Sequence, residues 1–176
     1  MMVKKSGQIW VETVIYTLIG LAIIGILLAA SKPKIDSMKD RLIIEQTIES
    51  MNAINEKIQE VYSKGPGNKR VLDLKVSRGK LILDTDGAEG DGIYWILDSE
   101  YEYSELDTEV PIGKLNVLTT KGEPWEIKLS VDYNFDLTYG GEDAKKEIGS
   151  ASTPYLLTVE NMGLEGGKIV VDLRVS

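Results

Sequence analysis

The chain has 176 residues, a length that fits one domain or one domain with an appendage. It contains neither cysteine nor histidine, which excludes disulfides, thiolate nucleophiles and the commonest general base and metal ligand. The formal net charge of −8 disfavours nucleic acid as a partner, because an acidic surface repels phosphates. This composition points away from an enzyme, and we expect no cofactor and no bound metal.

One uncharged apolar run dominates the N-terminal part of the chain. It covers residues 13–30 (TVIYTLIGLAIIGILLAA), and its 18 residues are just long enough to span a bilayer core of about 30 Å. A conventional secretory signal has an apolar region of only about 7–15 residues. It also keeps acidic residues away from the start of that region, where this chain has Glu12. The run therefore predicts a helix of membrane-spanning length.

An amphipathic stretch follows Lys32-Pro33. Apolar residues recur in steps of two to four between Ile35 and Val61, and charged residues occupy many of the intervening positions. This pattern predicts that the helix continues over residues 32–63, although a proline such as Pro33 can kink a helix. Residues 63–68 combine glycine with proline and predict the end of the helix.

Beyond residue 70 the chain has the pattern of β-strands. Strict period-two alternation over residues 127–139 predicts one bent strand or two. Shorter apolar runs predict the other strands: 72–76, 80–83, 93–97, 115–118, 155–159 and 169–175. The last two flank a Gly-rich turn, as in a hairpin. The predicted fold is α+β, a long N-terminal hydrophobic α-helix followed by a β-rich, sandwich-like head, and we expect residues 70–176 to fold alone as a monomer.

The first twelve residues contain a motif. Lys4 and Lys5 form a basic tip, Gly7 and Gln8 follow, and Glu12 stands near the start of the apolar helix. This order resembles the prepilin leader of type IV pilins, and Gln8 resembles the archaeal branch, the archaeal pilins and archaellins with class III signal peptides. The resemblance implies cleavage between Gly7 and Gln8 on the cytoplasmic side, with Lys4 and Lys5 as the leader charge.

The resemblance also implies a role for Glu12, which would become the fifth mature residue. Cleavage creates an α-amino group on Gln8, with a reference pKa near 7.7–8.0. In the resembled family the glutamate is thought to neutralise the terminal amine of a neighbouring subunit. A carboxylate at the edge of an apolar helix costs a few kcal/mol at bilayer depth and needs such a partner. In a plain membrane anchor, Glu12 would instead reach the lipid headgroups.

The organisation implied by the resemblance has three parts. Residues 1–7 are a cleaved leader, and residues 8–63 form the helix, with 8–31 in the membrane or filament core and 32–63 amphipathic. Residues 64–176 form an extracellular head. The implied partners are further copies of the chain in a helical homopolymer, a prepilin peptidase, the pilus assembly machinery, and the membrane before assembly. The implied location is the cell surface.

Two other interpretations of the N-terminal helix remain open. The chain could be a bitopic protein with an uncleaved helix, whose external β-domain binds a ligand. It could also be a secreted binding protein whose conventional signal is cut near residues 29–31, where small residues make a passable site.

An acidic loop at residues 84–92 invites a calcium interpretation. It fails the EF-hand pattern, because Ala88 and Glu89 stand where a ligand and the obligatory glycine should be. We expect a solvated turn rather than a metal site.

Overall fold

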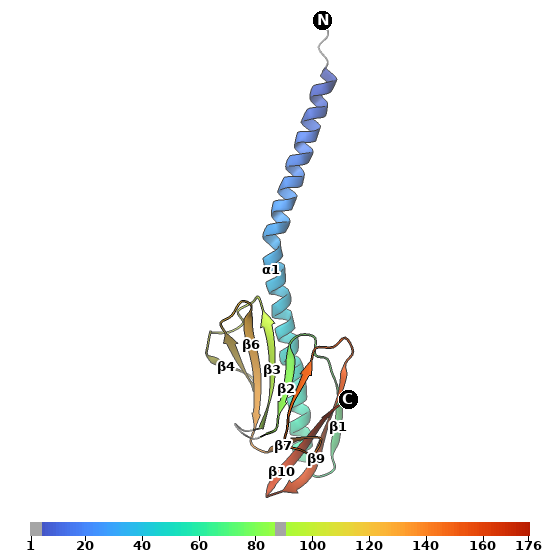
Figure 1. The fold of residues 1–176 in the computed structure, drawn as a ribbon, viewed down its shortest axis with the longest axis vertical. Coiled ribbons are helices and arrows are strands. Elements are labelled where there is room, and N and C mark those ends of the chain that lie inside the picture. The colour runs from blue at the N-terminus through green and yellow to red at the C-terminus, as the bar shows by residue number, and fades with distance from the viewer. Residues whose placement is uncertain (1–4, 87–90) are drawn as a thin grey trace. The chain divides into compact units, whose positions relative to one another are not determined.

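The computed structural model describes residues 5–86 and 91–176 (Figure 1). One helix, α1 (Lys5–Lys64), precedes ten strands in this part of the chain. The chain divides into two compact units, one that ends at Lys39 and a head unit, Asp40–Ser176. This architecture confirms the predicted α+β fold with an N-terminal helix and a β-rich head.

Helix α1 is continuous through Pro33 and ends where the sequence predicted. The hydroxyl of Ser37 donates a hydrogen bond of 3.0 Å to the carbonyl of Pro33. After Lys64, Gly65 has a φ of 87°, the left-handed conformation that commonly follows the last helical residue. Glycine adopts this conformation without the steric cost of a Cβ atom, so residues 63–68 stop the helix as expected.

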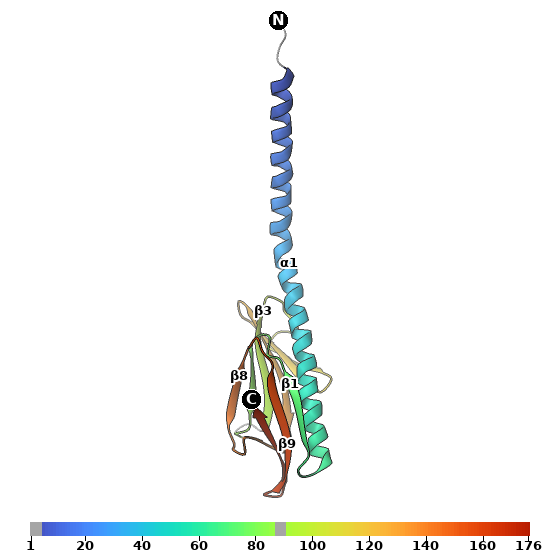
Figure 2. The same cartoon turned by 90° about the vertical axis from the view of Figure 1, so that its right-hand side faces the viewer.

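Two sheets make up the β-part of the head unit (Figure 2). The four-stranded sheet has the order β1-β9-β10-β7, and the six-stranded sheet has the order β4-β5-β6-β3-β2-β8. All neighbouring strands are antiparallel except β7 and β10, which are parallel. The strands are β1 (Lys69–Leu74), β2 (Lys80–Asp84), β3 (Asp91–Ser99), β4 (Glu109–Ile112), β5 (Leu115–Thr120), β6 (Trp125–Tyr133), β7 (Asp136–Tyr139), β8 (Lys145–Gly149), β9 (Tyr155–Glu165) and β10 (Lys168–Val175).

The long alternating run at residues 127–139 is two strands that belong to different sheets. β6 lies in the six-stranded sheet and β7 in the four-stranded sheet. Between them, Phe135 is buried and stacks on the ring of Tyr62 from α1, with ring centroids 4.1 Å apart. The alternation continues across the break because both sheets contribute side chains to one hydrophobic core.

The second half of α1 is part of that core. Six of its apolar side chains are at most 8% exposed: Ile44, Ile48, Met51, Ile54, Ile58 and Val61. The head unit therefore begins at Asp40, well before the predicted boundary at residue 64. The expectation that residues 70–176 fold alone is revised accordingly, because that fragment lacks one wall of the core.

Buried polar contacts fix α1 to the strands and loops of the head unit. The carboxylate of Asp40, 6% exposed, forms an ion pair with Arg78 and accepts a 2.6 Å hydrogen bond from the backbone N–H of Glu100. At the other end, the side-chain amide of Asn161 in β9 donates to the carbonyls of Val61 and Tyr62, at 3.0 and 3.3 Å. These carbonyls belong to the last turn of α1, which has no helical partners for them.

Candidate assembly surface

The first half of α1 exposes its apolar side chains on every face. Each large hydrophobic side chain between Trp10 and Leu28 is exposed, with Trp10 at 76% and Tyr16 at 72%. Within the described residues, helix α1 is long and apolar enough to cross a membrane. No residue in its most apolar 18-residue segment is buried. A helix that is hydrophobic all round needs lipid or other helices around it.

Two hydroxyl groups on this half of α1 are satisfied within the helix. The hydroxyl of Thr17 donates to the carbonyl of Thr13 at 2.8 Å, and that of Ser31 donates to the carbonyl of Leu27 at 2.7 Å. Because these donors bond to the turn that precedes them, they add little polar surface to the helix. The segment therefore offers other molecules an almost wholly apolar surface.

The residues of the leader motif lie at the start of α1. Lys4 lies outside the described residues, while Lys5, Gly7 and Gln8 belong to the first turns of the helix. Gln8 and Glu12 are four positions apart, so they share one helix face. Glu12 is exposed and has no ion pair within residues 5–86 and 91–176. Cleavage at Gly7 and the pairing of Glu12 with a neighbour's amine remain predictions.

A second exposed stripe was not anticipated from the sequence. Ile35, Met38 and Leu42 were expected to share the apolar stripe of the amphipathic helix, yet they are 50, 68 and 56% exposed. The sequence spacing from Leu42 to Ile44 indicates a change of helix face, because two residues turn a helix by about 200°. Leu42 therefore cannot share a face with Ile44, which is fully buried.

Basic residues cluster around this second stripe. Lys39 lies 3.7 Å from Asp36, and Arg41 donates a 2.9 Å hydrogen bond to Glu45. That hydrogen bond raises the pKa of Arg41. Lys32 is also exposed. Lys39 and Arg41 are thus paired with carboxylates on α1, whereas Lys32 forms no ion pair with a described residue.

The acidic loop offers no metal site in the described part of the chain. No group of three or more metal-binding side chains comes together there, and residues 87–90 of the loop lie outside it. Asp84 forms an ion pair of 2.8 Å with Lys145. Asp91 accepts a hydrogen bond from the backbone N–H of Leu137, and burial raises the pKa of its carboxyl. Both carboxylates thus have local structural contacts.

The comparisons with known proteins name no relative. No protein-family model, curated protein or solved structure matches the chain. The exposed apolar half of α1 and the two-sheet head are therefore the observations from which its function is inferred.

Proposed function

We propose that the chain is the structural subunit of a type IV pilus-like surface filament, which polymerises through its N-terminal helix. One observation carries this proposal, the exposure of every large hydrophobic side chain between Trp10 and Leu28. The same helix continues into the core of a β-rich head. A water-soluble monomer rarely exposes so much contiguous apolar surface, so this segment needs a partner.

The surroundings of the helix decide when it associates with other copies. In a membrane, lipid is as apolar as a leucine side chain, so the hydrophobic effect gives the helices little reason to pair. Outside the membrane, parallel packing of the same helices removes their apolar surface from water, which stabilises a filament. Extraction from the membrane is therefore coupled to polymerisation. The role is structural rather than enzymatic, with the heads on the outer surface.

The N-terminal motif supports the same proposal. Lys4 and Lys5 would hold the leader on the cytoplasmic side until cleavage after Gly7 releases it. The mature chain would then carry a positive amine on Gln8 and a negative carboxylate on Glu12. Pairing between neighbouring copies would let both charges enter an apolar filament core at lower cost than either charge alone.

The test is production of the full chain in an archaeal host that has a prepilin peptidase and a pilus assembly machinery. We expect sheared filaments visible by electron microscopy, built from chains whose intact mass corresponds to a start at Gln8. An uncleaved chain that stays in the membrane fraction would instead indicate a bitopic anchor for a ligand-binding head. A secreted chain that starts near Lys32 would indicate a conventional signal. Either result would overturn the proposal.

A further inference from the structure

The exposed stripe on α1 has the properties of one half of an interface. Ile35 and Met38 are 50% and 68% exposed, and their spacing of three residues places them on one face of the helix. Three exposed basic residues border this stripe: Lys32, Lys34 and Lys39. Neither Lys32 nor Lys34 has an ion pair with any residue that the structure describes. We refer to these two apolar residues as the collar stripe.

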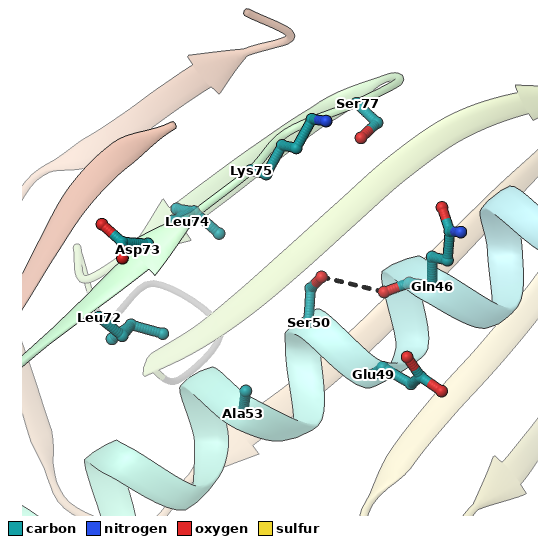
Figure 3. A pocket seen from close by; sticks show the side chains of 9 residues that line it. All are labelled: Gln46, Glu49, Ser50, Ala53, Leu72, Asp73, Leu74, Lys75 and Ser77. Carbon is teal, nitrogen blue, oxygen red and sulfur yellow. Dashed lines mark hydrogen bonds between the residues drawn. The ribbon is translucent and has the colours of Figure 1, made fainter. Parts of the chain in front are cut away.

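A groove on the head unit has complementary properties. It lies between α1 and β1, the edge strand of the four-stranded sheet, and has a volume of about 390 Å³ (Figure 3). Its apolar lining comes from Ala53 on the helix and from Leu72 and Leu74 on the strand. Exposed carboxylates of Glu49 and Asp73 stand beside these residues. We refer to this site as the α1–β1 groove.

The charge around the α1–β1 groove is negative and unneutralised. Neither Glu49 nor Asp73 forms an ion pair with another described residue. Lys75 is the one cation among the lining residues, so carboxylates outnumber it. Glu56 is exposed seven positions beyond Glu49 and extends the acidic face along the helix.

We propose that the α1–β1 groove receives the collar stripe of a second copy of the chain. This contact would hold the head unit of one copy to helix α1 of the next copy, and it rests on the proposed function. Met38 and its apolar neighbour would pack against Ala53 and Leu72, and the flanking lysines would face Glu49 and Asp73. Charge complementarity favours a second copy as the occupant, since the cationic stripe and the acidic groove belong to the same chain.

This contact can propagate from one copy to the next. The collar stripe and the groove are different surfaces, so each copy uses one of them toward the copy below and the other toward the copy above. Contacts of this heterologous kind form a ring when the rotation between copies closes and an open filament when it does not, and the proposed function requires the open form.

Cysteine cross-linking tests the proposal without background, because the chain contains no cysteine. The full chain would carry Met38→Cys alone, Ala53→Cys alone, or both, and sheared filaments would be treated with a short bifunctional maleimide. We expect a ladder of covalent multimers from the double variant and single chains from each single variant. The matched control is Met38→Cys with Thr153→Cys, an exposed position outside the groove, which should give single chains.

The other outcomes would overturn either the groove contact alone or the proposed function as well. Wild-type filaments with no ladder from the double variant would overturn the groove contact and leave the proposed function standing. Cross-linking of Met38→Cys alone would show stripe-to-stripe contact, and a ladder that stops at dimers would show a closed pair. Both results overturn the proposal. Absence of wild-type filaments would overturn the proposed function, and this inference with it.

A charge reversal provides a second measurement that leaves the cross-linking sites intact. In the double-cysteine background, Glu49→Lys should reduce the yield of multimers roughly two- to fivefold, the range expected for an exposed ion pair. Glu142→Lys makes the same charge change at an exposed position outside the groove and should leave the yield unchanged. Equal effects of the two reversals would overturn the assigned role of Glu49.

Discussion

A head fragment without its part of α1 should fail to fold cooperatively. The six helix side chains in the core are at most 8% exposed, and residues 70–176 lack all of them. Full burial of such a side chain stabilises a protein by about 1.5–3 kcal/mol, so the fragment would lose roughly 9–18 kcal/mol. The whole free energy of unfolding of a domain is only about 5–15 kcal/mol. The stabilisation lost with the helix is therefore as large as the whole free energy of unfolding of a typical domain.

Comparison of two purified fragments measures this effect. Residues 32–176 keep the buried part of α1 and should give a cooperative thermal transition by circular dichroism. Residues 70–176 should unfold without a cooperative transition or aggregate. A sharp transition of the shorter fragment, at a similar temperature, would refute the reasoning and would show that the sheets form a sufficient core by themselves.

A pair of substitutions within residues 32–176 separates core packing from helix length. Ile58 is fully buried, and Ile58→Ala should lower the free energy of unfolding by about 2–5 kcal/mol, since it leaves a cavity in the core. Leu42 is 56% exposed, and Leu42→Ala should change that free energy by about 0.5 kcal/mol or less. Equal losses in urea unfolding of the two variants would contradict the assignment of α1 to the core.

The remaining predictions concern the leader, the filament core and the start of the head unit. Intact mass of the protein isolated from producing cells should show cleavage after Gly7, and an intact N-terminus would contradict the leader assignment. Glu12→Gln should lower filament yield relative to membrane-inserted protein, because a neighbour's amine would enter the apolar core unpaired; an unchanged ratio would count against the pairing. Asp40→Ala should destabilise residues 32–176 by about 2–3 kcal/mol in urea unfolding, since it removes a partly buried ion pair and a charged hydrogen bond. Asp98→Ala, at an exposed carboxylate without an ion pair among the described residues, is the control, and an equal effect there would argue against a special role for Asp40.

The sequence predicted those elements whose local pattern agrees with their place in the fold. The end of α1 and the longer strands follow from glycine, proline and period-two alternation. β8 has no such pattern, since Ile148 is its only buried side chain and its pairing with β2 is what makes it a strand. β4 includes Pro111, which is tolerated because β4 is an edge strand.

The candidate assembly surface was predictable only in part. The apolar segment of α1 is evident from the sequence alone, since residues 13–30 contain no charge. The α1–β1 groove is not, because Ala53 and Leu72 come together only when α1 packs beside β1. Tertiary packing, rather than any local pattern, also decided that the head unit begins at Asp40.

The hydrogen bonds from Asn161 to the end of α1 have a consequence for the order of folding. Asn161 lies 100 residues beyond Val61 in the chain, so during synthesis the last turn of the helix emerges long before its cap exists. Contacts between residues so distant in sequence form late, because closing the intervening loop costs entropy before the contact repays it. The carbonyls at the end of the helix therefore gain their bonds to Asn161 only after β9 has been made. A newly made chain held in the membrane by its first half would complete its head only after nearly all of it had been translated.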